Sequence, residues 1–191
     1  MRKLYAAMLE PARFGSKDLT KAGIIAALYV ILTLPFAQFS YGIVQFRLAE
    51  ILAVLPILSS AAIPGVFVGC LLANLLNPQS LGPIDVLAGS LATLLAAWQS
   101  YKLGWIWRRS SRRSKATRIR ITRRHIIALL PPIVINALVV GMYLPFLLLD
   151  KVTVSIVASS IGSIALTQTI VIIILGLPLL LAVFRTGQLR G

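Results

Sequence analysis

The sequence predicts an all-α integral membrane protein with six transmembrane helices and with both termini in the cytoplasm. The first observation is composition: 58% of the 191 residues are hydrophobic, 13% are charged, and the mean hydropathy is +0.90. Soluble domains carry about 25% charged residues, so a soluble core is excluded. The second observation is that six apolar runs, most of them near the length needed to cross a bilayer, alternate with short polar segments. We therefore expect one integral membrane domain over residues 1–191.

The third observation is the distribution of positive charge, which predicts the orientation. The net charge is +14, and ten of the nineteen Lys and Arg residues lie between Lys102 and Arg124. Cytoplasmic loops are enriched in Lys and Arg, so the basic loop 108–124, the lead 1–21 and the C-terminal end are all expected in the cytoplasm. There the basic loop would face anionic lipid. A nucleic-acid partner is not expected, because no polar, foldable domain carries the basic patch.

The first expected span covers residues 22–39 and begins with small residues. Ala22, Gly23, Ala26 and Ala27 form overlapping pairs spaced four residues apart. Such pairs remove side-chain bulk from a helix face and allow another helix to approach closely. From spacing alone, packing inside the bundle is the favoured interpretation. A proline at position 35 is expected to end or kink this helix.

The second and third expected spans cover residues 46–58 and 61–76. The second carries Arg47 and Glu50 and is short for a membrane span, so one of its ends should be tucked inside the bundle. In the third, Gly65 and Gly69 permit close packing, and an asparagine at position 74 interrupts its apolar end. A loop over residues 77–83 follows.

The last three expected spans complete the bundle. The fourth opens at Asp85, which is also compatible with a simple helix-capping role, and closes with aromatic residues typical of a membrane interface. The fifth covers residues 126–149 and carries Asn136. The sixth covers residues 154–184, is tilted or broken near a glycine and a proline at 176 and 178, and carries Gln168 near its middle.

Five polar residues in these apolar spans are the candidate substrate-binding residues. A charge in hydrocarbon costs at least about 2.5 kcal/mol, so an intramembrane charge indicates a functional site. Arg47 and Glu50 are three positions apart and share a helical face. Together with Asn74 and Asp85 they are expected near the outer ends of spans two to four, with Asn136 deeper. Such a set predicts a cavity for a small polar ligand, although each residue alone could serve as an interhelical contact worth about 0.6 kcal/mol.

The sequence contains no pattern that would support catalysis or energy transduction. There is no phosphate-binding G-x-x-x-x-G-K-[ST] loop, and the single histidine and single cysteine exclude a metal cluster or an internal disulfide. We therefore expect no enzymatic activity, no metal and no cofactor. The remaining classes are a stand-alone small-molecule carrier, a binding subunit driven by other proteins, and a structural membrane protein.

Several stretches give the sequence a family resemblance. They are AALYVILTLP, SYGIVQFRLAEILAVLPIL, GCLLANLLNP, IDVLAGSLATLLAA and, more thinly, PPIVINALVVG. The elements Q-F-R-x-x-E, A-N-L and D-x-x-x-G-S-x-A-T within them are specific. The sequence resembles the QueT-type queuosine-precursor transporter family, whose members are S components of energy-coupling factor (ECF) transporters, a type of ABC importer. The resemblance covers residues 22–97 most closely.

The resemblance implies a fold, a location and a set of partners. It implies a six-helix S-component bundle in the bacterial plasma membrane that captures a queuosine precursor, a deazaguanine-type base, from outside. It also implies a transmembrane coupling subunit and two ATPases as separate proteins. S components dock on the coupling subunit through small residues of the first helix, here Ala22 and Ala26 or Gly23 and Ala27, and the resemblance makes docking the favoured role of these residues. Another vitamin-like micronutrient remains an alternative substrate.

Overall fold

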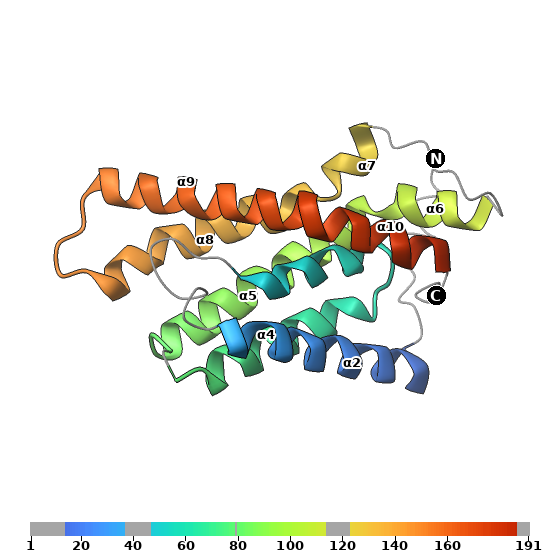
Figure 1. Ribbon diagram of the computed structural model, residues 1–191, viewed down its shortest axis with the longest axis horizontal. Helices are drawn as coiled ribbons and strands as arrows, with labels where there is room; N and C mark the ends of the chain where they lie inside the picture. Colours follow the sequence, from blue (N-terminus) through green and yellow to red (C-terminus); the bar gives the residue numbers. More distant parts are fainter. Residues whose placement is uncertain (1–13, 37–46, 79, 114–122, 187–191) are drawn as a thin grey trace.

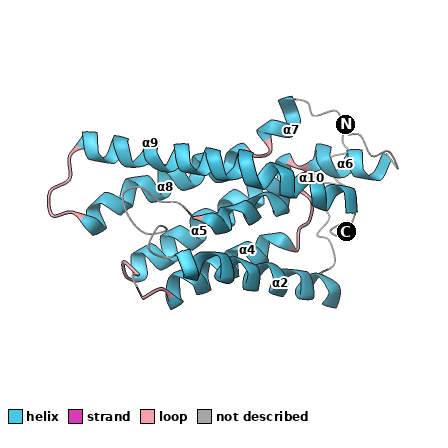
Figure 2. Cartoon of the chain, viewed as in Figure 1, coloured by secondary structure: helices cyan, strands magenta, loops and turns pink. Residues whose placement is uncertain are grey.

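The computed structural model describes residues 14–36, 47–78, 80–113 and 123–186. Within these ranges the secondary structure is entirely helical, with short connecting loops, which confirms the all-α part of the predicted class (Figure 2). Residues 1–13 of the expected lead 1–21, residues 37–39 of the first expected span, residue 46 of the second, residues 114–122 of the basic loop and residues 187–191 at the C-terminal end lie outside the described ranges. The elements in order are α2 (Ser16–Thr33), η1 (Leu34–Phe36), η2 (Leu48–Ile57), α4 (Ala62–Leu76), α5 (Pro83–Leu103), α6 (Trp105–Arg113), α7 (Arg123–Ile127), α8 (Leu130–Leu148), α9 (Val154–Ile170), η3 (Val171–Gly176) and α10 (Leu177–Thr186).

Three helical stretches in the described part are long and apolar enough to cross a membrane. They cover Ser16–Phe36, His125–Leu148 and Val154–Thr186, while η2 and α4 are shorter apolar helices. Large apolar side chains are exposed on the outer faces of these helices and of α5, among them Ile31, Leu91, Leu138 and Leu166. In a bilayer such side chains face lipid, so the exposed apolar surface is what a multi-pass membrane protein requires.

The first helix starts earlier than position 22, where its apolar run begins. The carboxylate of Asp18 accepts a hydrogen bond of 3.2 Å from the backbone N–H of Gly15. A carboxylate in the first turn satisfies a free N–H group and interacts favourably with the positive N-terminal end of the helix dipole. The polar residues before position 22 therefore extend the helix. At the other end, Pro35 lies in the single 3₁₀ turn η1, where α2 ends as expected.

The basic segment expected as a loop is helical at both of its ends. α6 continues from α5 after Gly104 and runs into this segment, and α7 leaves it again. Trp107 anchors α6, because its buried ring packs edge-on against His125 and Phe184 and its Nε1–H donates to the carbonyl of His125. Arg108 donates from Nη1 to the carbonyls of Ile57, at 2.9 Å, and of Tyr101, at 2.6 Å. These contacts pack α6 onto the bundle.

The elements form a bundle with two distinct ends (Figure 1). The start of α2, the end of α10, α6 and α7 lie at one end, and the α4–α5 and α8–α9 turns lie at the other. α9, η3 and α10 make one long helix, and the irregularity expected near Gly176 takes the form of the π-helical segment η3. The basic stretches within the described residues thus gather at a single end.

η2 is the central element of the bundle. It is a 3₁₀ helix of 10 residues, and all but Leu48 and Ile51 are buried, in keeping with the expectation that this short span is tucked inside. It packs against α2, α4, α5 and η3. At about 2.0 Å per residue, a 3₁₀ helix of this length covers about 20 Å, against about 15 Å for an α-helix. The tighter winding therefore lets a short apolar segment reach further through the bundle.

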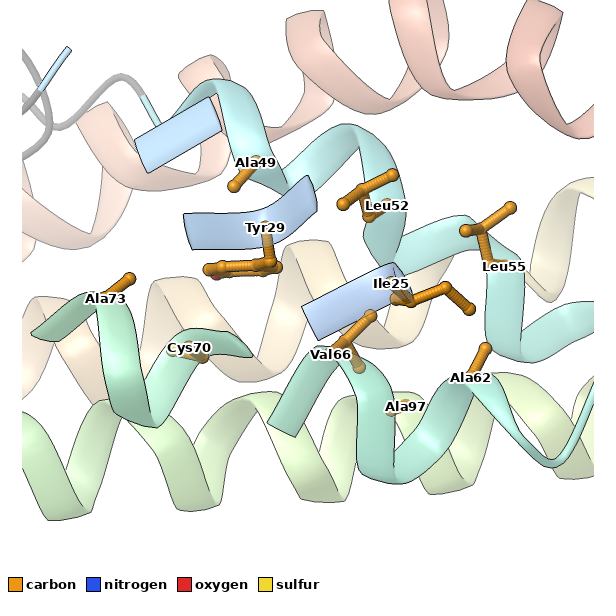
Figure 3. Packing of buried hydrophobic residues seen from close by; sticks show 10 residues of the cluster. All are labelled: Ile25, Tyr29, Ala49, Leu52, Leu55, Ala62, Val66, Cys70, Ala73 and Ala97. Carbon is orange, nitrogen blue, oxygen red and sulfur yellow. The ribbon is translucent and has the colours of Figure 1, made fainter. Parts of the chain in front are cut away.

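α2 and α4 approach each other closely because α4 carries two glycines. A Cβ on Gly65 would lie 2.9 Å from the carbonyl of Ala22, and a Cβ on Gly69 would lie 2.5 Å from Cβ of Tyr29. The contact places the Tyr29 ring between η2 and α4, near Ala49 and Cys70 (Figure 3). Cys70 is free and buried in this contact. This close packing fixes the position of the Tyr29 side chain.

Candidate ligand-binding site

The carboxylate of Glu50 is buried in the bundle and is hydrogen-bonded by side chains from other helices. Its exposed fraction is 1%. Oε1 accepts from the hydroxyl of Tyr29 on α2 at 3.1 Å, and Oε2 accepts from Nδ2 of Asn136 on α8 at 3.2 Å. The side chain of Gln168 on α9 lies close to this carboxylate as well. A carboxylate removed from water needs such donors, so Glu50 is a centre on which several elements converge.

The local backbone explains why Arg47 and Glu50 lie on one side of η2. Arg47 is the N-cap residue with an extended backbone, and its carbonyl accepts a hydrogen bond of 3.2 Å from the N–H of Glu50. In a 3₁₀ helix, residues three apart are stacked one above the other. The guanidinium of Arg47 accordingly interacts electrostatically with the carboxylate of Glu50, and also with Tyr143.

Asp85 is the second buried carboxylate of the site. It lies in the first turn of α5, is completely buried, and accepts at Oδ1 a hydrogen bond of 2.7 Å from the hydroxyl of Tyr143 on α8. The N-cap of α5 is Gly82, at a φ of 99° that favours glycine, and no side chain caps this helix. The carboxylate of Asp85 therefore does not act as a helix cap, which was the alternative role compatible with the sequence.

Gly89 lies one turn after Asp85, and the groups around it define the neighbourhood of the second carboxylate. A Cβ on Gly89 would lie 3.3 Å from Nδ2 of Asn74, 3.3 Å from the hydroxyl of Tyr143 and 4.0 Å from Nη1 of Arg47. Polar groups from the start of η2, from α4 and from α8 thus meet against a position that has no side chain. The absence of a Cβ at position 89 leaves these polar groups room to meet.

Three buried acceptor atoms at this site have no hydrogen-bond partner within the described residues. They are Oδ2 of Asp85, Oδ1 of Asn136 and Oε1 of Gln168. Some hydroxyl groups in the same helices donate to a carbonyl one turn earlier, namely those of Ser90, Thr93 and Thr167. The buried hydroxyls of Ser100 and Ser160 have no partner within the described residues. A buried acceptor left without a donor costs about 1–3 kcal/mol, and each of the three atoms can accept a hydrogen bond from a further donor.

The structure brings the five predicted substrate-binding residues into one region. All five are buried: Arg47, Glu50, Asn74, Asp85 and Asn136. Glu50 contacts Asn136 directly. Asn74 and Arg47 both lie beside Gly89, and Asp85 is joined to this group through the hydroxyl of Tyr143. Their role in binding stays a prediction.

Sequence reasoning missed two tyrosines of the site, Tyr29 and Tyr143. Each lies in an apolar run, where the sequence pattern predicts no more than a residue of a membrane span. The available signal was the phenolic hydroxyl, because a hydroxyl in the membrane interior must find an acceptor, and the nearest strong acceptors are the buried carboxylates. The two tyrosines serve one carboxylate each, Tyr29 for Glu50 and Tyr143 for Asp85.

The four small residues of α2 are divided between two faces. Ala22 and Ala26 are buried, and the carbonyls of both lie against the glycines of α4. Gly23 and Ala27 are exposed, and a Cβ on Gly23 would meet nothing within 4 Å. Internal packing thus accounts for Ala22 and Ala26. Gly23 and Ala27 leave a surface without protruding side chains on the outside of the bundle. The docking role of these residues stays a prediction.

Comparison with known proteins agrees with this architecture. The family model described as QueT transporter matches residues 19–185. A curated relative, the queuosine precursor transporter QueT of Lactococcus lactis subsp. cremoris (strain MG1363), is 39% identical over 80 residues, which cover 41% of this chain and 46% of the relative. The chain thus spans less than half of that relative's length in the alignment. No solved structure matches. Since the family match covers most of the sequence, this multi-pass protein of the cell membrane belongs to the QueT transporter family.

Proposed function

We propose that this protein is the substrate-binding S component of an ECF-type importer and that it captures a queuosine precursor, a deazaguanine-type base, from outside the cell. Membership of the QueT transporter family and the name of the curated relative support this substrate class. The family assignment also supports transport rather than catalysis by this chain.

The observation that carries the proposal is the surplus of buried acceptors around Glu50. A carboxylate offers about four lone-pair sites. The hydroxyl of Tyr29 and the amide of Asn136 occupy one site on each oxygen, which leaves one on each. A guanine-like base presents adjacent N–H donors along one edge, and a carboxylate accepts two such bonds well. The unpartnered amide oxygens of Asn136 and Gln168 add acceptors for the rest of the ring.

The transport role requires a topology and a set of partners. In our proposal the six spans are α2, η2, α4, α5, α8 and the long helix Val154–Thr186, and both termini are cytoplasmic. The end that carries the basic helices α6 and α7 then faces the cytoplasm, where anionic lipid attracts Lys and Arg. Asp85, in the first turn of α5, then lies toward the outside. A coupling subunit and two ATPases complete the importer, and the exposed pair Gly23 and Ala27 is the proposed docking surface.

The proposal is tested by ligand identification and calorimetry on the purified protein. Mass spectrometry of material released by denaturation should find a deazaguanine-type base, and titration with that base should give saturable binding of one molecule per chain. Guanine, vitamin-like heterocycles and buffer serve as controls. Copurification from cells that contain the ECF subunits should yield a complex. A protein that binds none of the deazaguanines, or that transports without any ATPase, contradicts the proposal.

A further inference from the structure

We infer that Arg108 is a positioning residue for ligand capture: it fastens the last turn of η2 to the joint between α5 and α6, and it thereby fixes where Glu50 lies in the candidate site. The inference rests on the proposed function, since its readout is the affinity for the proposed base. Arg108 contacts the opposite end of η2 from Glu50, so it acts through this helix.

The guanidinium of Arg108 caps the C-terminal ends of two helices. Its Nη1 donates to the carbonyl of Ile57, the last residue of η2, at 2.9 Å, and to the carbonyl of Tyr101, in the last turn of α5, at 2.6 Å. The guanidinium carbon also lies 3.9 Å from the centroid of the Tyr101 ring. The last carbonyls of a helix lack partners within the helix and carry the negative end of its dipole, so a cation there is favourable. Arg108 therefore joins the end of η2 to the end of α5.

The backbone of the joint between α5 and α6 fits closely against the same end of η2. A Cβ on Gly104 would lie 2.5 Å from the carbonyl oxygen of Ile57 and 2.8 Å from its Cα. The φ of Gly104 is −71°, a value that does not require glycine, so the absence of a side chain serves the close approach. The N–H of Arg108 donates to the carbonyl of Gly104 at 3.1 Å, which places Arg108 one turn after the joint. The close approach and the hydrogen bond thus act on the same residue, Ile57.

α6 is itself fixed to another part of the bundle. The ring of Trp107, beside Arg108 in the sequence, is completely buried and packs edge-on against His125 and Phe184, with ring centroids 4.9 Å and 5.8 Å apart. Its Nε1–H donates to the carbonyl of His125 at 3.1 Å. The residue that holds the end of η2 is therefore mounted on a helix that is packed in place.

η2 carries this constraint to Glu50. Ile57 follows Glu50 by seven residues, which is about 14 Å at about 2.0 Å per residue of 3₁₀ helix. Every residue between them except Ile51 is buried. The donors to Glu50 come from other helices, Tyr29 on α2 and Asn136 on α8, so a shift of η2 along its axis changes both hydrogen bonds. Since the groups of a binding site must be held to within about 0.5 Å, release of Ile57 should misplace the carboxylate.

The experiment measures ligand affinity by calorimetry on the purified full-length protein, and the probe is the deazaguanine base that the parent protein binds most tightly. Arg108→Met keeps the length of the side chain and removes its donors and its charge, so the affinity should fall at least about threefold. Arg108→Lys restores a charge and a donor without the planar group that stacks on Tyr101, and it should recover part of the loss. Arg109→Met is the matched control, because it removes the same charge from the next, exposed residue and should leave the affinity unchanged.

A double variant separates positioning of Glu50 from a general loss of stability. In the Glu50→Gln protein, Arg108→Met should lower the affinity by a smaller factor than in the parent, because part of its effect passes through the carboxylate. A loss of bundle stability alone would lower the affinity by the same factor in both proteins. Thermal unfolding verifies that each variant is folded.

The outcomes for the inference and for the proposed function differ. Parent-like affinity in folded Arg108→Met, or equal factors in the two backgrounds, overturns the inference and leaves the proposed function intact. If Arg108→Met does not fold, Gly104→Ala decides, because its methyl group would displace Ile57 while Arg108 is kept. It should also lower the affinity at least about threefold, and parent-like affinity there overturns the inference. A parent protein that binds none of the deazaguanines overturns both.

Discussion

The hydroxyl of Tyr29 and the carboxylate of Glu50 are joined by a hydrogen bond of 3.1 Å between α2 and η2, although the residues are 21 positions apart in the sequence. The glycines of α4 let α2 come close enough to make this contact, because a Cβ on Gly69 would collide with Tyr29. The packing of the apolar core and the chemistry of the candidate site thus depend on the same side chain.

Tyr29→Phe should destabilise the protein and weaken ligand binding. The change removes one donor from a buried carboxylate and leaves Oε1 with one bond fewer, which costs about 1–3 kcal/mol. Thermal unfolding in detergent and calorimetry measure the two effects. Tyr101→Phe is the control, since it keeps the ring on which Arg108 stacks and lies away from Glu50. Unchanged stability in Tyr29→Phe would mean that the contact contributes nothing.

Glu50→Gln should reduce ligand affinity by about 2 kcal/mol or more, the scale for a buried hydrogen bond to a charged group. The amide has one oxygen and one NH₂ group, so its NH₂ group must face a donor from Tyr29 or Asn136, or the donors of the ligand. Calorimetry measures the affinity, and copurification verifies that the variant still joins the coupling complex. Asp150→Asn, in the exposed α8–α9 turn, is the control. Parent-like affinity in Glu50→Gln would assign Glu50 a purely structural role.

Two glycine-to-alanine changes should have opposite effects. Gly69→Ala places a methyl group 2.5 Å from Cβ of Tyr29, so α2 and α4 must separate, and overpacking of this kind costs about 1–3 kcal/mol. Gly162→Ala, in α9, meets nothing within 4 Å and should be neutral or stabilising by about 0.5–1 kcal/mol. Thermal unfolding compares the two. Gly69→Ala should also lower ligand affinity, because it moves Tyr29.

Ala27→Trp should abolish ATP-driven uptake and leave ligand binding unchanged. Ala27 is exposed on α2, and a large side chain there would hold a docked partner helix away. Ala26→Trp should behave differently, because Ala26 is buried against α4 and its replacement should destabilise the bundle itself. Leu28→Trp, at a residue that is already large and exposed, is the control. Normal uptake by Ala27→Trp would move the docking surface elsewhere.

Single introduced cysteines should report the orientation. Cys70 is completely buried, so the parent should give a low background with impermeant thiol reagents. Ser80→Cys, in the α4–α5 connection, should react with such a reagent added to whole cells. Ser111→Cys, in α6, should react only after the cells are opened. The reverse pattern would invert the topology and place Asp85 toward the cytoplasm.

The sequence predicted the members of the site better than it predicted their contacts. Glu50 and Asn136 were identifiable because a charge or an amide in an apolar run must find a partner. The partner Tyr29 was not identifiable from the sequence, since its position opposite Glu50 depends on how closely α2 approaches α4. The same limit applies to the small residues of α2: the pairs beginning at positions 22 and 23 have identical spacing, and only the rotation of α2 about its axis buries one and exposes the other.

The 3₁₀ form of η2 could not be predicted either. A segment with apolar residues on all sides shows no period, so a repeat of three residues per turn cannot be told from one of 3.6. The helix at the start of the basic segment, α6, was missed for another reason. Its arginines suggested a loop, whereas the burial of Trp107 and the bonds of Arg108 to Ile57 and Tyr101 hold it in place.

The winding of η2 also restricts how this part of the sequence can vary among related proteins. Each residue of a 3₁₀ helix turns the chain by about 120°, so residues fall into three fixed columns. Inserting or deleting one residue between Glu50 and Pro56 would turn Glu50 into a different column relative to the rest of the helix, away from Tyr29 and Asn136. Nearly every column of η2 is buried, and no loop within it can absorb the change. This segment should therefore keep its length even where its apolar residues are exchanged for one another.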